Sequence, residues 1–474
     1  MGIRRGCSLV VCALFLFFSW ACSSGGSVRE VDPRARAEYR QTAPIRVVET
    51  GVGYANSTVN TVVFRHHALV TRGSAQFFSY YDDQGYIAVG RRDLRDDSFE
   101  IHRIPGDYRI YDAHNCISLG IDPDGYLHIS YDHHGDPLRY RRSLEPLSVS
   151  AWSDPMPMTG VLEDRVTYPY FIMSPSNSND WEFQGGLHFL YRHGLSGNGD
   201  ICLKSCDAGT RSWSDKALSF VKGTEQNPWP ANAYWNHPAF DSQGRMHLSW
   251  VWRVNRGAPP GGIINNINMG YACTPDMGTT WLTSRGLSLP LPITPVNGET
   301  IWAISPGSNL INQCSSAIDS KDRLHIVAYA DDPDGVPQYF HIWFDGRWWQ
   351  FQFITRRTEP FGLAGGGAFG ALQIPFSRPQ IVIDRKDRVY VIYRGDLTKD
   401  RMVAQRLDPP DYQAPGTVVQ LWDRDLVHAE PVLDFVRWKR DGVLSMLIQK
   451  NFQPNRKDAA EIAPEPVYLV DWEL

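Results

Sequence analysis

A two-strand unit with a polar turn recurs along the chain, and it limits the possible fold more than any other feature. Each copy has an apolar run, a turn rich in Asp and Gly, and a second run that alternates apolar and aromatic residues, as in "SLGIDPDGYLHISYD" from residue 118. Copies begin near residues 67, 118, 168, 238, 316, 380 and 433. Such alternation between turn residues indicates antiparallel strands. One unit cannot bury both faces of its sheet, so the repeats predict an all-β chain forming a seven-bladed β-propeller.

A second motif supports the same fold. The segment "TPDMGTTW" (274–281) fits the Asp-box pattern through Asp276, Gly278, Thr280 and Trp281. In such a turn the Asp accepts backbone hydrogen bonds and the Trp packs between strands, so the motif is structural. The rival fold is a pair of β-sandwich domains, but no Pro/Ser-rich linker or composition shift divides the mature chain. We expect residues 45–474 to form one propeller domain.

The N-terminus predicts export. Residues 1–22 contain two arginines and an apolar run that is too short for a comfortable membrane span. The following "SWACSSGG" resembles a bacterial lipoprotein cleavage site, in which Cys22 becomes the lipidated first residue. We predict a signal peptide of lipoprotein type over 1–22 and a tether over 23–44, with an ordinary secretory signal as the alternative. The expected location is the cell surface or periplasm, or the medium if no lipid is attached.

Net charge and cysteine content remove two classes of protein. A net charge of −5 argues against a general nucleic-acid binder, which is usually basic. Five cysteines remain after the export segment, and an odd, widely spaced set is no disulfide framework. We expect these cysteines to be small buried residues in strands, with a local disulfide or metal site at "CLKSC" (202–206) as the alternative. The five are Cys116, Cys202, Cys206, Cys273 and Cys314.

The spacing of residues around the turns predicts a site. In a β-hairpin, residues equally far from the turn face each other. His114 and His134 lie equally far from Asp124 in the turn "DPDG", so they should flank the same open end of a hairpin. In the next unit, Tyr168 and Arg192 are equally far from the long turn's centre at residue 180.

Later units place similar residues at corresponding strand ends. Tyr234 precedes the turn near Gln243, and Arg378 and Arg394 flank the turn "DRKD" about symmetrically. In a propeller with parallel inner strands, these ends lie round one mouth of the central channel. A His, Tyr and Arg cluster at that mouth suits an anionic ligand.

The same residue types suit one reaction. Cleavage beside a uronic acid without water requires removal of the weakly acidic C5 proton next to a carboxylate. An Arg must neutralise that carboxylate, and His or Tyr can take the proton and protonate the departing O4. Glycoside hydrolases usually need two carboxylates instead. The inventory therefore favours a β-eliminating polysaccharide lyase.

At these residues the chain resembles the BNR-repeat propeller proteins that include ulvan lyases. The most specific parts are "HN" at 114, "HGDPLRY" from 134, "TYP" from 167 and "YRHGLSGNG" from 191. The resemblance covers nearly the whole mature chain and implies cleavage of a sulfated, uronic-acid-containing polysaccharide such as ulvan. Departures are the longer turn before Arg192 and the lack of a clear metal motif.

The resemblance also implies roles for residues. Catalysis is expected from His114, His134, Tyr168 and Arg192. Beside these roles, substrate contacts are expected from Tyr234, which matches a family tyrosine by spacing alone, and from Asn115, Arg378, Arg394 and His133, which the resemblance does not assign. No cofactor is expected for catalysis. A structural metal, bound by some relatives, is possible, but its ligands cannot be placed.

Two other functions stay open. A sialidase-like glycoside hydrolase would use Arg192, Arg378 and Arg394 on a carboxylate with Tyr168, but it would leave the aligned histidines without a purpose. A non-catalytic surface glycan-binding lipoprotein would keep the arginines and aromatics without needing a His and Tyr pair. A metal site at Cys116 and His114 is a further alternative to catalysis.

Overall fold

A computed structural model describes residues 27–28, 37–177, 179–223, 231–254, 266–363, 375–453 and 462–474. The predicted signal peptide, Cys22 and most of the predicted tether lie outside the described residues. Within the described part of the chain, no helix is both long enough and apolar enough to span a bilayer.

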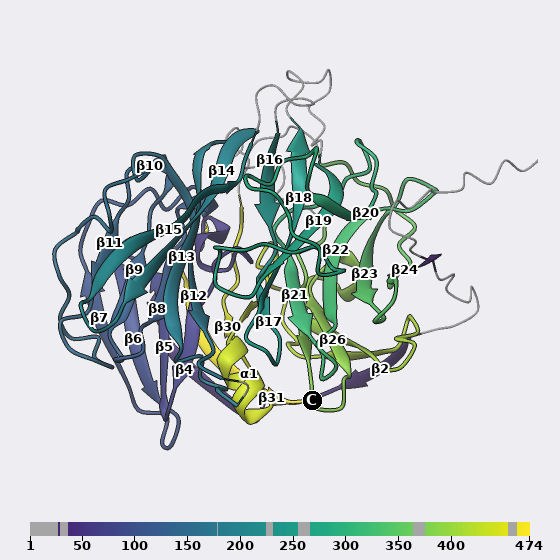
Figure 1. Cartoon of the computed structure of the whole chain (residues 1–474). Coiled ribbons are helices and arrows are strands. Elements are labelled where there is room, and N and C mark those ends of the chain that lie inside the picture. Colours follow the sequence, from purple (N-terminus) through teal and green to yellow (C-terminus); the bar gives the residue numbers. More distant parts are fainter. Residues whose placement is uncertain are drawn as a thin grey trace, which may run out of the picture.

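The described strands form seven sheets that stand round a ring, so the fold is the predicted seven-bladed β-propeller (Figure 1). Neighbouring strands within each core sheet pair antiparallel. The first blade comprises β4 (Leu69–Arg72), β5 (Ala75–Tyr81), β6 (Ile87–Asp93) and β7 (Phe99–Ile104). The second comprises β8 (Ser118–Ile121), β9 (Leu127–Ser130) and β11 (Tyr140–Arg142). The third comprises β10 (His134–Asp136), β12 (Val166–Ser174), β13 (Gly186–Leu195), β14 (Asn198–Asp207) and β15 (Ser212–Val221). The fourth and fifth comprise β16 (Ala231–Trp235), β17 (Ala239–Phe240), β18 (Met246–Val254), β19 (Asn266–Thr274) and β20 (Glu299–Trp302); and β21 (Ser315–Ile318), β22 (Leu324–Asp331), β23 (Pro337–Phe344) and β24 (Trp349–Phe353). The last two comprise β25 (Gln380–Ile383), β26 (Val389–Tyr393), β27 (Val403–Leu407) and β28 (Thr417–Gln420); and β29 (Val432–Leu433), β30 (Val443–Ile448), β31 (Glu465–Glu473) and β3 (Arg46–Gly53).

The ring is closed by a strand from the start of the propeller. Strand β3 pairs antiparallel with β31, near the end of the chain, so both ends of the domain share the seventh blade. Two short strands precede it: β1 (Ser27–Val28) pairs parallel with β24, and β2 (Glu38–Gln41) pairs parallel with β28. These segments of the predicted tether thus lie on the outer edges of two blades.

The seventh unit differs from its predicted strand–turn–strand form. A helix, α1 (Phe435–Asp441), connects β29 to β30. Asp434 begins the helix by accepting the backbone N–H of Arg437, and Gly442 ends it in the left-handed conformation at φ 72°. The helix lies at the lower end of the ring in Figure 1.

The Asp-box prediction is confirmed. Asp276 Oδ1 accepts the backbone N–H groups of Thr279 and Thr280 at 3.0 and 2.8 Å. Trp281 is buried and stacks on Phe220 with ring centroids 4.5 Å apart. The five described cysteines are all free, and the structure contains no disulfide at 202–206.

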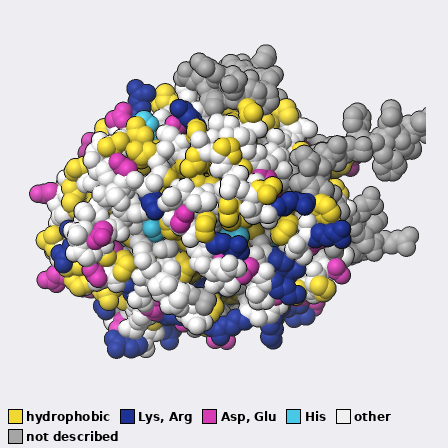
Figure 2. Space-filling model, in the orientation of Figure 1, with side chains coloured by type: hydrophobic (Ala, Val, Ile, Leu, Met, Phe, Trp, Pro, Cys, Tyr) yellow, Lys and Arg dark blue, Asp and Glu magenta, His cyan; other side chains and the backbone are white. Residues whose placement is uncertain are grey.

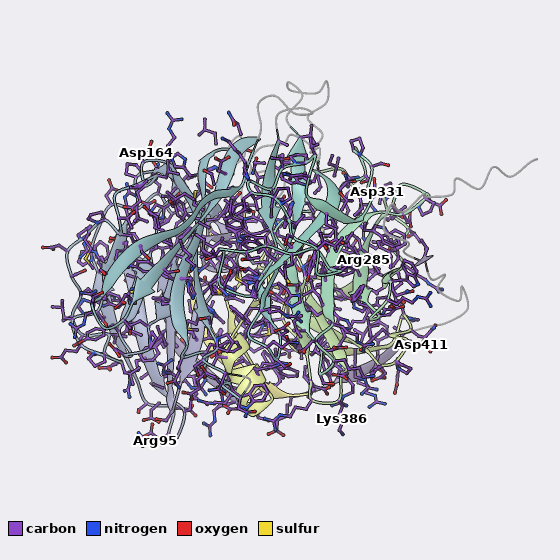
Figure 3. The ribbon with its side chains drawn as sticks, in the orientation of Figure 1. Arg95, Asp164, Arg285, Asp331, Lys386 and Asp411 are labelled. Carbon is purple, nitrogen blue, oxygen red and sulfur yellow. The ribbon has the colours of Figure 1, made fainter. Side chains whose placement is uncertain are left out.

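The hairpin turns and the open strand ends lie at opposite rims. Figure 3 places Lys386, in the β25–β26 turn, at the lower rim and Asp164, just before β12, at the upper rim. Figure 2 shows acidic and basic side chains interspersed over the visible face. The open ends of the hairpins, where the sequence predicts the site, therefore face away from α1.

The short 3₁₀ turns are η1 (Thr58–Asn60), η2 (Ala113–Asn115) and η4 (Asp396–Thr398).

Candidate active site

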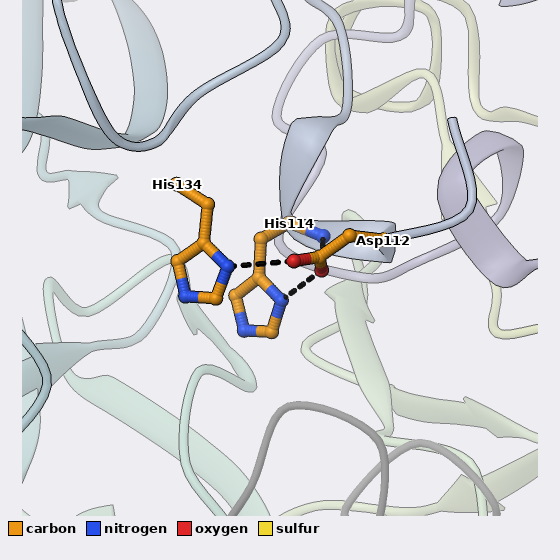
Figure 4. Close-up of side chains that lie close together, drawn as sticks. All are labelled: Asp112, His114 and His134. Carbon is orange, nitrogen blue, oxygen red and sulfur yellow. Dashed lines mark hydrogen bonds and ion pairs between the residues drawn. The ribbon is translucent and has the colours of Figure 1, made fainter. Parts of the chain in front are cut away.

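The two predicted histidines meet at the open end of the β8–β9 hairpin. The register pairs Ser118 with Ser130, and continuing it outward brings position 114 opposite position 134. The imidazole rings stack with centroids 4.1 Å apart and an angle of 8° between the planes (Figure 4). The predicted juxtaposition of His114 and His134 is thus present.

Asp112 joins the two histidines, and the sequence analysis missed it. Its Oδ1 lies 2.7 Å from His114 Nδ1, and its Oδ2 lies 2.7 Å from His134 Nδ1. Asp112 also begins η2 by accepting the backbone N–H of His114 at 3.0 Å. The Asp-x-His spacing before a short turn was the available signal, because an Asx side chain commonly caps such a turn. Both Nδ1 atoms donate to the carboxylate, which leaves both Nε2 atoms facing away from it (Figure 4).

Burial and neighbouring groups set the charges of His114 and Asp112. Burial, and after it the charge of the neighbouring His134, lower the pKa of His114 to about 4 against the opposing effect of Asp112. Although burial alone raises the pKa of the Asp112 carboxyl, the charges and hydrogen bonds of the two histidines hold it well below its usual range. At pH 7 His114 is therefore neutral with a free Nε2 lone pair, beside an ionised Asp112.

A strand that crosses between blades brings this group to the next hairpin. His134 begins β10, which pairs with β12 through His134 and Thr167. Thr167 Oγ1 accepts the backbone N–H of Gly135 at 2.8 Å and the Nη2 of Arg192 at 2.9 Å. The histidine pair and Arg192 are thus fixed relative to each other through one threonine.

Tyr168 sits in a β-bulge between them. The register shifts between Thr167, which faces Arg192, and Tyr170, which faces Leu190. Tyr168 has a φ of 57°, a left-handed conformation that is strained for a tyrosine. The bulge turns its ring toward His114, at a centroid distance of 5.6 Å, and the Arg192 guanidinium lies 5.0 Å from the same ring. Bulges commonly re-aim side chains at functional sites.

Arg192 is a buried cation that lacks a carboxylate partner among the described residues. Its Nη1 donates to the Tyr234 hydroxyl at 3.3 Å and its Nη2 to Thr167, while Nε is buried without a hydrogen-bond acceptor. A guanidinium in this state is ready to receive a carboxylate through two N–H groups.

Tyr234 lies beside Arg192, as the spacing predicted, and also beside Arg253, which the sequence analysis missed. The guanidinium of Arg253 is 4.5 Å from the Tyr234 ring and that of Arg192 is 5.9 Å from it. Burial acts to raise the pKa of both tyrosines. For Tyr168 it outweighs the nearby arginine charges, so the pKa of Tyr168 lies above its ordinary value. For Tyr234, the charges of Arg253 and Arg192 outweigh burial and lower the pKa.

The remaining predicted contacts fall into two groups. Arg378 lies near the cluster, since its guanidinium is 5.6 Å from the Phe64 ring, which packs on Tyr168; its charge is balanced by Glu430 at 3.2 Å. Asn115 is buried and its Nδ2 donates to the Arg109 carbonyl at 2.7 Å. Its amide therefore supports the turn that carries His114.

Two predicted substrate contacts already form hydrogen bonds within the protein. His133 is fully buried, its Nε2 accepts the backbone N–H of Arg139 at 2.6 Å, and burial lowers its pKa to about 3. Arg394 is buried and donates to the carbonyl of Ala429 at 2.9 Å and to Asp400 at 3.1 Å. Both side chains are thus bonded within the protein, and their contact with a substrate stays a prediction.

Asp112, His114 and His134 also form the one group of three potential metal ligands with atoms within 4.8 Å of one another in the described part of the chain. Their geometry does not fit a metal ion. The Nδ1 atoms lie at hydrogen-bond distance from the carboxylate oxygens, and the stacked rings direct their Nε2 lone pairs side by side rather than at one point.

A separate cavity of about 110 Å³ lies elsewhere along the inner strands, and its lining is mainly apolar. His66 and His237 face it, with their Nδ1 atoms 2.7 Å apart. None of the predicted catalytic residues lines this cavity. The site of interest is therefore the cluster at the open strand ends.

Comparisons with known proteins agree with this architecture. Residues 75–357, more than half of the chain, match the BNR repeat-containing family. Curated relatives include an ulvan lyase of Alteromonas sp. (strain LOR), 24% identical over 266 residues that cover 50% of this chain and 52% of that protein. The long isoform of an ulvan lyase of Pseudoalteromonas sp. (strain PLSV) is 22% identical over 294 residues, which cover 50% of this chain and 28% of that protein. The matched part thus spans about half or less of these relatives.

Two solved structures share the fold over nearly their full length. One is a PL25 ulvan lyase bound to -[GlcA(1-4)Rha3S]-, with a TM-score of 0.62, 14% identity, and coverage of 90% of this chain and 96% of that one. The other is the polysaccharide lyase Uly1, with a TM-score of 0.61, 15% identity, and coverage of 96% and 97%. At such identity the likeness shows the propeller fold.

Proposed function

The chain belongs to the BNR repeat-containing family, and on this premise we propose that it is a polysaccharide lyase that cleaves a uronic-acid-containing polymer by β-elimination. The observation that carries the proposal is the placement of Tyr168 between the Asp112-linked histidines and Arg192, a buried arginine without a carboxylate partner among the described residues. The similarity to ulvan lyases supports a sulfated, ulvan-like substrate.

The first step needs charge neutralisation. Removal of the C5 proton places negative charge on the uronate carboxylate, and a preorganised cation lowers that barrier. Arg192 is held by Thr167 and Tyr234 through neutral hydrogen bonds, so its positive charge is available to the substrate. Burial strengthens the interaction because water does not screen it.

The second requirement is a proton acceptor and a proton donor. The neutral Nε2 of His114 can accept a proton, and Asp112 stabilises the imidazolium that forms. The hydroxyl of Tyr168 keeps its proton, because burial raises its pKa, and can pass it to the departing O4. His134 completes the group by sharing Asp112 and bordering the reacting centre.

A sialidase-like hydrolase fits less well. That reaction would need Arg192, Arg378 and Arg394 together on one carboxylate. Two of the three already pair with acidic side chains, Arg378 with Glu430 and Arg394 with Asp400. Asp112, the carboxylate in contact with the histidines, is occupied by both of them. A non-catalytic glycan-binding protein would not require the strained conformation of Tyr168.

The test is the appearance of an unsaturated uronate. The protein is incubated with ulvan and with other uronic-acid polymers, and the ultraviolet absorbance of the new double bond is followed. We expect absorbance with wild type, its loss in Tyr168→Phe, and wild-type rates in Tyr111→Phe, which changes an exposed tyrosine. Chain shortening without absorbance would indicate a hydrolase, and binding without either would indicate a binding protein.

We also propose export from the cytoplasm, with attachment to a membrane through a lipid on Cys22, on the basis of the sequence of residues 1–22. The test is fractionation of cells that express the full chain or Cys22→Ala. Membrane association of wild type and its loss in the variant are expected. A soluble exported wild type would instead indicate an ordinary secretory signal.

A further inference from the structure

Arg253 differs from most buried or half-buried arginines of this protein. It lies on β18, next to the cluster, with its guanidinium over the Tyr234 ring. Its Nε donates to Asn266 Oδ1 and its Nη2 to Asn312 Oδ1, each at 2.9 Å. Within the described residues it makes no ion pair, and its Nη1 makes no hydrogen bond.

The two asparagines orient this cation without neutralising it. Both are buried, and a neutral amide oxygen balances little of a full positive charge. Several buried arginines of the protein pair with a carboxylate, as Arg92 does with Asp471 at 2.9 Å, whereas Arg65 is held by carbonyl and hydroxyl oxygens. Arg253 is partly removed from water, and leaving such a cation without an anion has a cost that a charged ligand would offset.

Arg253 and Arg192 stand over the same tyrosine ring, which puts two uncompensated positive charges beside the reacting centre. Both charges act on Tyr168 and Tyr234. A single uronate carboxylate carries one negative charge and can be held by Arg192 alone. The second cation therefore calls for a second anionic group on the substrate.

We propose that Arg253 binds the sulfate ester of the sugar adjacent to the uronate at the cleavage site, which makes it a specificity-determining residue. The inference rests on the proposed function and names which anion the second arginine recognises. The planar fork of a guanidinium matches two oxygens of a sulfate, and Asn266 and Asn312 hold its plane in advance. A half-buried position leaves the remaining N–H groups within reach of a ligand.

The test compares Arg253→Gln with wild type on sulfated ulvan and on the same polymer after chemical desulfation. For the sulfated polymer we expect KM to rise roughly 10- to 100-fold with little change in kcat, as for loss of a charge-assisted hydrogen bond. For the desulfated polymer, wild type and variant should have similar KM values. Arg253→Lys keeps the charge but loses the planar fork of the guanidinium. Its KM for the sulfated polymer should lie between those of wild type and Arg253→Gln.

Control and binding measurements make the result decisive. Arg285→Gln removes an exposed arginine that also lies over an aromatic ring, Trp348, and should leave both KM values unchanged. Equal losses on both polymers would overturn the proposal in favour of a shared carboxylate, and no loss on either would overturn it outright. Calorimetric titration with sulfated and desulfated oligosaccharides gives the same comparison without turnover, so it still decides the role of Arg253 if the protein releases no unsaturated product.

Discussion

His114 and His134 share one carboxylate: each donates its Nδ1–H to a different oxygen of Asp112 at 2.7 Å, and their rings stack at 4.1 Å. Two imidazoles this close repel each other when both are charged. The Asp112 carboxylate places one negative charge between them. The arrangement fixes both tautomers and presents two Nε2 atoms to the same space.

Asp112→Asn should therefore impair turnover more than binding. An amide can present its NH₂ group to an imidazole, which favours the wrong tautomer, and it cannot stabilise an imidazolium. We expect kcat to fall on the order of 10²- to 10⁴-fold, with KM changed far less. Initial rates of ultraviolet absorbance measure both parameters.

Asp164→Asn is the matched control for this change, because that carboxylate is exposed and bonds His193 at 2.9 Å outside the cluster. Its kcat should remain within about twofold of wild type. If Asp112→Asn retained wild-type kcat with unchanged folding, the shared carboxylate would have no catalytic importance.

Arg192→Gln should remove the positive charge that neutralises the uronate carboxylate, although the glutamine amide can still form two hydrogen bonds. We expect kcat/KM to fall roughly 10²- to 10³-fold, as for loss of a preorganised charge-stabilising donor, and Arg192→Lys to recover part of it. Rates on a uronic-acid polymer provide the measurement. Arg165→Gln, at an exposed arginine, serves as control, and full activity in Arg192→Gln would exclude this role.

The sequence predicted the hairpin geometry because register depends on local turn position. Ser118 faces Ser130 as the turn at residue 124 requires, and the pairing extends to the histidines. Tyr168 shows the limit of this reasoning. The equal spacing placed it opposite Arg192, but the bulge gives that place to Thr167. A bulge follows from packing between blades, which no single hairpin encodes.

Other features depend on contacts that are distant in sequence. The Asp112 to His134 bond joins a 3₁₀ turn to a crossing strand, so equal spacing about a turn could not reveal it. Arg253 sits in β18, a strand rich in aromatic residues, and its lack of a carboxylate partner among the described residues is visible only in three dimensions. The helix α1 was missed because its two turns occupy the place of a short hairpin loop.

Stability should fall on acidification, and His114 contributes to the effect. Its pKa is about 4 in the folded protein and about 6.5 in an unfolded chain, so the unfolded state binds the proton more tightly between these values. The contribution is complete above pH 6.5 and is lost as pH falls toward 4, on the order of 3 kcal/mol in all. Urea unfolding across this range should show a shallower pH dependence in His114→Gln, and an identical dependence would contradict the assignment.

Catalysis should follow the same titration. If the neutral Nε2 of His114 accepts the proton, kcat/KM should fall only below about pH 5, well under the ordinary histidine range. A pH–rate profile with a short incubation at each pH separates this limb from unfolding. If the His114→Gln variant keeps some activity and its kcat/KM falls at the same acidic pH, the titrating group is not His114.

Asp471→Asn should destabilise the propeller without involving the site. Asp471 lies on β31, is fully buried, and pairs with Arg92 at 2.9 Å and with Arg437 at 2.8 Å. These partners come from the first blade and from α1, so the carboxylate helps to fasten the closing blade to its neighbour. Removing the charge leaves Arg92 with Asp97 alone, at 2.6 Å, and Arg437 with only the more distant Asp441, at 3.9 Å. We therefore expect the free energy of unfolding to fall by about 3 kcal/mol, the lower end for breaking a buried ion pair. Chemical denaturation measures the change. Glu473→Gln, at the exposed end of the same strand, should shift it by less than about 0.5 kcal/mol; equal stability of the two variants would show that the buried pair does not hold the ring closed.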